Sequence, residues 1–269
     1  MKAGGLRIYA YLYLLFLYAP IILLPLFAFN DGTIIAFPLN GFTTKWFDEL
    51  WTIPALHQAV KNSLIIIAIS SAVFSTMLGI FAARAITRYD FPGKTAMSGL
   101  IMLPLVLPEV IVAVSLLVVL LAMGIPLAFW TVIFGHVLIC TPYAVAILSS
   151  AFSSLDRSLE EASIDLGETR MSTFRLVTLP LVAPGIVSSL LIAFTISLDE
   201  FIIAYFLTGS QPTLPVYIFS QFRFPAKVPV VMALGTILVI LSVVLLTLAE
   251  MFRRRGVRRR GGVDTGGFL

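Results

Sequence analysis

Four ionisable side chains lie inside long hydrophobic runs, where they could contact a charged solute. They are Glu109, His136, Asp199 and Glu200. A charged side chain at the centre of a membrane helix costs roughly 2.5–3.5 kcal/mol, so such groups usually face a water-filled path or a polar partner. At about 1.5 Å of rise per residue, Glu109, His136 and Asp199 fall at similar depth, in the middle or outer half of a bilayer. No Lys or Arg lies in the core of these runs, so the pattern favours a path for a cation.

Each of these groups also has a structural interpretation. Glu109 could hydrogen-bond within a helix kink, and His136 could be an internal hydrogen-bond partner. Asp199 and Glu200 are about 100° apart around a helix, so at most one of them points straight into a narrow path. We assign Asp199 to the path, whereas Glu200 either lines it or pairs with a partner subunit.

Further contacts to a cation are predicted around these groups. Pro104 and Pro108 precede Glu109 and can loosen the helix, which exposes carbonyl oxygens as acceptors. Aromatic faces can hold an ammonium group by cation–π contacts. The candidate substrate path therefore comprises Asp199, Glu109, Glu200, Trp46, Tyr18, Tyr143 and His136.

The elements that carry these groups are predicted to be membrane helices. The chain has 269 residues, of which 59% are hydrophobic and 12% are charged, whereas a soluble domain has about 25% charged residues. Its mean hydropathy is +1.02. Runs long enough to cross ~30 Å of hydrocarbon are present, without the alternation of barrel strands. We expect an all-α integral membrane protein with one transmembrane domain over residues 1–269 and six spans, at about 8–29, 63–83, 97–122, 127–152, 184–207 and 228–252.

The basic residues predict the orientation of these spans. Fourteen of the 18 Lys and Arg residues fall on the side that holds both termini, including the arginine-rich tail at 253–260. Because cytoplasmic loops carry the excess of basic residues, both termini are predicted to lie in the cytoplasm. Topology and contact with membrane lipid then account for the net charge of +4, so we expect no nucleic-acid partner.

A polar segment between the fourth and fifth spans is predicted to form two short helices. It reads EEASIDLGETRMSTFRLVTLP over residues 160–180. Asp156 can cap the first helix, and Gly167 fits the left-handed residue that ends it. We expect the second helix at about 172–178, ended by Pro180. The segment would therefore be a compact helix–turn–helix at the cytoplasmic membrane surface.

This segment resembles the E-A-A-x3-G-x9-I-x-L-P signature of ABC importer permeases, whose corresponding loop docks on an ATPase subunit. Ser163 replaces the second alanine and Val177 replaces the isoleucine, and the other signature positions match. The resemblance implies the type I ABC importer permease fold, with a cytoplasmic coupling loop at 153–183. An ordinary amphipathic loop is the alternative. The implied ATPase-docking residues are Glu160, Glu161, Ala162, Ser163, Asp165, Gly167, Leu179 and Pro180.

Shorter matches are similar to the second permease subunit of spermidine/putrescine-type importers. They are FAFN at 27–30, GFTTKWF at 41–47, AVKNSL at 59–64, SLDEF at 197–201 and FLTG at 206–209. This resemblance implies that the solute is a polyamine. Related permeases for iron, thiamine, opines, phosphonates or amino-acid-like solutes share parts of the pattern and stay alternatives.

The sequence holds no catalytic set, metal-ligand cluster or phosphate-binding glycine loop. The chain is therefore expected not to be an enzyme and to bind no cofactor or metal, with ATP and Mg²⁺ held by a partner ATPase. The resemblance implies a bacterial inner-membrane complex with a second homologous permease, two ATPase subunits and an extracytoplasmic binding protein. A rival hypothesis is a self-sufficient proton-coupled secondary transporter, which the membrane carboxylates would permit.

Overall fold

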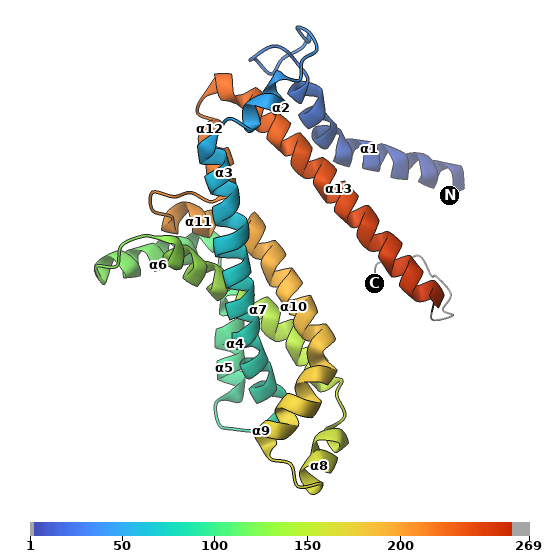
Figure 1. Cartoon of the computed structure of the whole chain (residues 1–269), viewed down its shortest axis with the longest axis vertical. Coiled ribbons are helices and arrows are strands. Elements are labelled where there is room, and N and C mark those ends of the chain that lie inside the picture. Colours follow the sequence, from blue (N-terminus) through green and yellow to red (C-terminus); the bar gives the residue numbers. More distant parts are fainter. Residues whose placement is uncertain (1–2, 260–269) are drawn as a thin grey trace. The chain divides into compact units, whose positions relative to one another are not determined.

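The computed structural model describes residues 3–259, which form helices joined by loops (Figure 1). The chain divides into two compact units. One holds the residues up to Pro54 together with those from Ile218 onward, and the other is Ala55–Tyr217. No strand occurs between residues 3 and 259, where a single isolated bridge pairs Asn30 with Phe42. The side chains of the arginine-rich tail lie outside the described part of the chain.

The first unit is built on two long apolar helices. α1 (Ala3–Ala28) and α13 (Val228–Arg259) pack against each other, and the short helix α2 (Lys45–Leu50) also contacts α13. A 3₁₀ turn, η3 (Pro225–Lys227), leads directly into α13. The residue ranges of α1 and α13 overlap the first and last predicted spans, 8–29 and 228–252.

Polar contacts fix the loop after α1. The indole Nε1 of Trp46 donates to the carbonyl oxygen of Asn30 at 2.7 Å, and the Asn30 side chain accepts from the backbone N–H of Asn40 at 2.9 Å. Lys227 Nζ contacts Glu49 Oε1 at 2.8 Å, which ties the start of α13 to α2. The Trp46 side chain is therefore a buried structural element of this unit.

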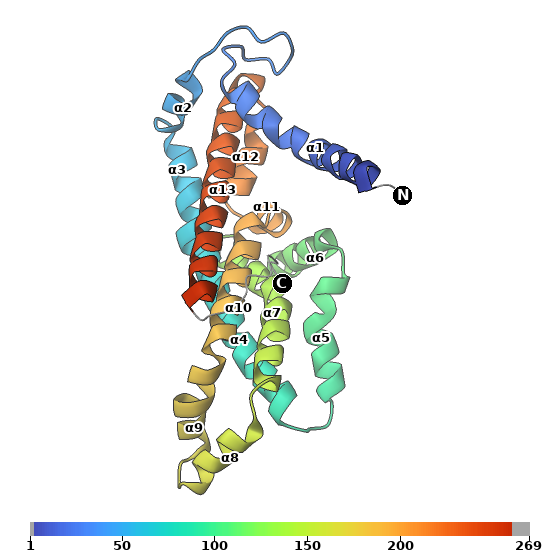
Figure 2. The ribbon, with the colours of Figure 1, turned by 90° about the vertical axis from the view of Figure 1, so that its right-hand side faces the viewer.

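The second unit is a helical bundle in which α4 (Ile69–Arg88), α7 (Phe129–Ser153) and α10 (Leu179–Asp199) run side by side (Figures 1 and 2). α5 (Lys94–Val106) packs on α7, while α6 (Glu109–Ala122) packs on α11 (Ile202–Leu207). The remaining helices are α3 (Pro54–Lys61), the π-helical η1 (Asn62–Ala68), α8 (Arg157–Asp165), α9 (Arg170–Thr173) and the π-helical η2 (Phe174–Thr178). The helix α12 (Leu214–Gln221) contains the boundary between the two units, after Tyr217.

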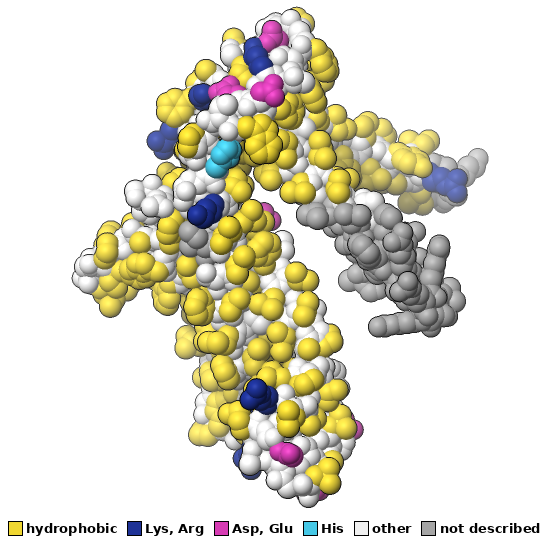
Figure 3. Space-filling view, viewed as in Figure 1, with side chains coloured by type: hydrophobic (Ala, Val, Ile, Leu, Met, Phe, Trp, Pro, Cys, Tyr) yellow, Lys and Arg dark blue, Asp and Glu magenta, His cyan; other side chains and the backbone are white. Residues whose placement is uncertain are grey.

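Small residues let the long helices of this bundle approach closely. A Cβ atom placed on Gly79 of α4 would lie 2.9 Å from the Ala144 Cβ of α7, so that position has no room for a larger side chain. Thr76 and Ser189 share a buried hydrogen bond of 3.1 Å that joins α4 to α10. Small residues and interhelical hydroxyl contacts are typical of helix packing in membranes. Hydrophobic side chains cover the visible face of this unit, and charged ones gather near α8 and α9 (Figure 3).

The region of the third predicted span, 97–122, differs from the expected straight helix. Of the described helices, five are long and apolar enough to cross a membrane, or six if α5 and α6 together form one span. α5 and α6 meet at a bend of 106°. The bend has a local cause, because Pro108 cannot donate a backbone hydrogen bond and forces Leu107 into an extended conformation.

The fifth predicted span, 184–207, is also interrupted. α10 ends at Asp199, Glu200 has an extended backbone, and α11 begins at Ile202. Asp199 and Glu200 therefore lie at a helix end, whereas the sequence placed them within a continuous helix. α10 also begins before the predicted span, because it continues directly from the preceding polar segment.

Candidate functional site

The loop between α7 and α10 contains the two short helices that the sequence predicted. Asp156 caps α8 by accepting the Ser158 backbone N–H at 3.0 Å. This hydrogen bond holds the pKa of the exposed Asp156 carboxyl below its ordinary value. At the other end, Gly167 has φ of +95°. The Glu168 N–H donates to the Ser163 carbonyl at 3.2 Å, which completes a Schellman C-cap.

The second short helix does not end at Pro180. α9, η2 and α10 form one helix from Arg170 to Asp199, so the expected stop before the next span is wrong. Pro180 is the second residue of α10, directly after the π-helical turn of η2. A π-helical turn changes the hydrogen-bond register, and the helix continues past the proline there. The loop between α7 and α10 is thus joined to α10 by a continuous helix.

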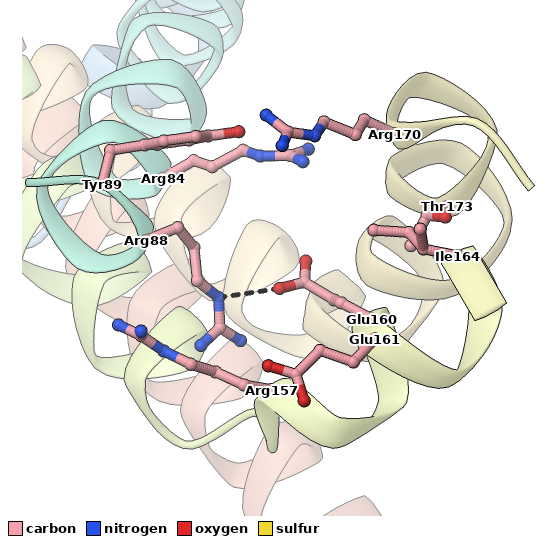
Figure 4. A pocket seen from close by; sticks show the side chains of 9 residues that line it. All are labelled: Arg84, Arg88, Tyr89, Arg157, Glu160, Glu161, Ile164, Arg170 and Thr173. Atoms are coloured by element: carbon pink, nitrogen blue, oxygen red, sulfur yellow. Dashed lines mark ion pairs between the residues drawn. The ribbon is translucent and has the colours of Figure 1, made fainter.

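The inner face of α8 is anchored to the bundle by polar contacts. Glu160 Oε2 lies 3.0 Å from Arg88 Nε in the last turn of α4, the pair drawn as a dashed line in Figure 4. The other Glu160 oxygen accepts from the Thr178 hydroxyl at 2.6 Å. Ser163 and Thr173 share a buried hydrogen bond of 3.1 Å between α8 and α9. Sequence reasoning missed this role of Arg88, which it used only as a marker of orientation.

The side of α8 that faces away from Glu160 and Ser163 is exposed and mainly polar. Exposed apolar side chains include Leu159 and Ile164 at the edges of this side and Leu166 directly after the helix, at 45%, 44% and 87%. The predicted docking residues divide between the two faces. Glu160 and Ser163 point inward, and Leu179 is half-buried at the start of α10. The exposed members of the set are Glu161, Ala162, Asp165, Gly167 and Pro180.

The carboxylates of the predicted path occupy two kinds of position. Asp199 and Glu109 are exposed, at the last residue of α10 and the first residue of α6. Glu200 is buried, and its Oε1 accepts the Ile203 backbone N–H at 2.8 Å, so it caps α11. α6, which begins at Glu109, packs on α11, whose N-terminus Glu200 caps. Both carboxylates therefore lie at the starts of two helices that pack together, and Glu200 already has a hydrogen-bond partner there.

The histidine and the aromatic residues are placed differently. His136 is fully buried in α7, and its Nδ1 lies 2.7 Å from the Ser197 hydroxyl of α10. It is an internal hydrogen-bond partner, which was the alternative considered from the sequence. Tyr143 is 41% exposed on α7. Tyr18 and Trp46 belong to the first unit, and Trp46 is occupied by its contact with Asn30.

Comparison with known proteins identifies the class. Residues 75–258 match the family described as binding-protein-dependent transport system inner membrane component. The chain belongs to this family. It is 37% identical over 250 residues to the spermidine/putrescine transport system permease protein PotC of Escherichia coli (strain K12), covering 92% of this chain and 91% of that protein. It is also 37% identical over 231 residues to the putrescine transport system permease protein PotI of the same strain, covering 83% of this chain and 81% of that protein.

Solved structures support the fold independently. A bacterial ABC transporter that imports the acidic polysaccharide alginate contains a chain with a TM-score of 0.71 and 21% identity, and the match covers 94% of both chains. A second structure of an alginate ABC transporter gives a TM-score of 0.69 at 22% identity. The predicted all-α ABC importer permease fold is confirmed. The chain is thus the membrane component of a transport system, a subunit that carries no catalytic activity itself.

Proposed function

We propose that this chain is the permease subunit of an ATP-driven importer for a small organic cation, most specifically a polyamine such as spermidine or putrescine. The observation that carries the proposal is the extensive similarity to polyamine permeases. The two exposed carboxylates, Asp199 and Glu109, add a chemical reason. A carboxylate can form a charge-assisted hydrogen bond with an ammonium group, worth roughly 1.5–3 kcal/mol.

The proposed path is narrower than the residue set taken from the sequence. Asp199 and Glu109 stay in it because both are exposed and lie at helix ends. Tyr143 stays as an exposed aromatic that could contact an ammonium. Glu200 and His136 are assigned to structure, since each already has a buried hydrogen-bond partner.

The proposed complex contains a second permease, two ATPase subunits and an extracytoplasmic binding protein. The family description supports dependence on a binding protein, and the alginate transporter was solved with a substrate-bound periplasmic protein. ATP and Mg²⁺ would be held by the ATPase subunits. Both termini and the α8–α9 loop would lie in the cytoplasm of the bacterial inner membrane, as the distribution of basic residues favours.

The proposed ATPase contact is the exposed side of α8 that faces away from Glu160 and Ser163. It presents Ala162 and Asp165, with Leu166 directly after the helix. The inner contacts of Glu160 and Ser163 would then transmit force from the docked ATPase into α4 and α10.

Uptake of radiolabelled spermidine and putrescine tests the function, in cells that carry the whole importer and lack other polyamine transporters. We expect ATP-dependent uptake that disappears when this chain is deleted. Uptake of an anionic solute in place of either polyamine would reject the cation assignment. Transport by the chain without any ATPase would instead favour the proton-coupled transporter.

A further inference from the structure

An arginine-lined cavity lies beside the coupling loop, on the side facing the end of α4. Its volume is about 390 Å³, within the range of about 300–1,000 Å³ that is usual for ligand sites. α4, α8 and α9 all contribute to its wall (Figure 4). Four arginines and two glutamates line it, so its charged groups have a surplus of positive charge.

Two of the four arginines are engaged by neighbouring groups. Arg88 forms the ion pair with Glu160 and donates from Nη2 to the Leu155 carbonyl at 2.9 Å. Arg157 donates to the Thr87 carbonyl at 3.0 Å, and Glu161 lines the cavity near it (Figure 4). The two glutamates therefore lie with Arg88 and Arg157, and the uncompensated positive charge of the cavity lies on the opposite wall.

That wall carries Arg84 of α4 and Arg170 of α9. Neither forms an ion pair with another residue of the described range 3–259. Arg84 is held in place by stacking, with its Cζ 4.0 Å from the centre of the Phe174 ring. The two guanidinium groups point toward each other, and the Tyr89 hydroxyl lies on the same side (Figure 4). Like charges brought together in this way repel unless an anion lies between them.

We propose that this cavity binds a phosphate-bearing anion between Arg84 and Arg170. The planar guanidinium fork matches phosphate oxygens and can bind them in a bidentate manner, and the Tyr89 hydroxyl supplies a further donor. The occupant would bridge α4 and α9 and so stabilise the loop against the bundle. This site goes beyond the proposed transport function, since it involves neither the solute nor the ATPase-facing side of α8.

The phosphate has two possible sources. A lipid headgroup is favoured by position, because basic pockets at the cytoplasmic ends of membrane helices bind anionic lipids. α4 also exposes Leu78 and Phe81 in the turns before Arg84, at 46% and 60%, where they could contact acyl chains. Free phosphate is the other source, because the cavity is open to solvent.

The test uses the full-length chain in detergent and two probes. Native mass spectrometry measures retention of phosphatidylglycerol against phosphatidylcholine, and calorimetry measures binding of inorganic phosphate. The test variant is Arg170→Gln. Its matched control is Arg175→Gln, which removes the same charge from an exposed position of the same loop outside the cavity. Arg84→Gln provides a second test variant, with helix content checked by circular dichroism.

We expect Arg170→Gln and Arg84→Gln each to weaken anion binding about tenfold or more, as loss of a charge-assisted hydrogen bond predicts, while Arg175→Gln binds like the wild type. Preference for phosphatidylglycerol alone would identify a lipid site, and binding of inorganic phosphate alone would identify a soluble ligand. The proposal is overturned if neither probe binds, or if Arg175→Gln weakens binding as much. If neither probe binds and Arg170→Gln releases the ATPase, the arginines instead contact an acidic surface of that partner.

Discussion

Replacing Glu160 with glutamine should loosen α8 from the bundle. The Arg88–Glu160 pair is 3.0 Å long, and its side chains are only 9% and 15% exposed. An exposed ion pair contributes about 0–1 kcal/mol, whereas breaking a buried one costs about 3–5 kcal/mol. Glu160→Gln retains the shape and one acceptor for Thr178, so we expect an intermediate cost of about 2 kcal/mol, or roughly a 30-fold shift toward the detached loop.

Hydrogen exchange of the α8 backbone amides, measured on the assembled importer, reports this local opening directly. Glu160→Gln should accelerate exchange in α8 about 30-fold, lower polyamine uptake, and leave membrane insertion unchanged. Glu168→Gln is the matched control, because Glu168 is an exposed glutamate of the same loop. A double-mutant cycle with Arg88→Gln should give a coupling energy of about 2 kcal/mol if the two residues act as a pair.

Two results would refute this reasoning. Equal exchange in Glu160→Gln and Glu168→Gln would mean that the ion pair does not hold the loop, as would a coupling energy within about 0.5 kcal/mol of zero. Reduced ATPase co-purification with unchanged α8 exchange would show that Glu160 contacts the ATPase directly, which was the role predicted from the sequence.

Three further predictions concern the loop, the path and the topology. Gly167→Val should strain the turn by about 1–2 kcal/mol or more, because φ is +95° there; uptake and ATPase co-purification should fall together, and an active, intact complex would contradict this. Asp199→Asn should slow uptake of labelled spermidine about tenfold or more at unchanged expression; normal uptake would show that the path is lined elsewhere. In a Cys140→Ala background, a membrane-impermeant thiol reagent applied outside should label a cysteine at Ser210 and not one at Ser172, and the reverse pattern would place the loop outside.

The helical architecture could be predicted because its causes are local in the sequence. Long apolar runs indicate membrane helices, and the left-handed turn at Gly167 follows from the conformational freedom of glycine. The bend at Pro108 had a visible signal, since proline restricts the preceding residue, but the size of the bend depends on packing. The interruption at Glu200 within the predicted span 184–207 had no such signal. In the sequence, a glutamate that caps a new helix cannot be distinguished from a carboxylate within a continuous membrane helix.

The site was predicted only in part, because its decisive contacts join distant parts of the chain. Arg88 and Glu160 are separated by the whole of α5, α6 and α7. The sequence contains several other arginines and acidic residues, so it does not indicate that Arg88 and Glu160 form an ion pair with each other. The sequence placed both at the cytoplasmic surface, and only the packing of α4 against the loop divides the docking residues into inner and outer faces.

The helix from Arg170 to Asp199 connects the two proposed sites of the second unit. Its 30 residues span about 45 Å at 1.5 Å of rise per residue, with the coupling loop at one end and Asp199 at the other. Because the helix continues past Pro180, a displacement of α9 would be carried along α10 to Asp199. The extended backbone at Glu200 then separates α10 from α11. α11 packs with α6, the helix that begins at Glu109. If α8 binds the ATPase and the two carboxylates line the path, as proposed, movement of the loop would change the separation of Asp199 and Glu109 and so alter the affinity for a cation.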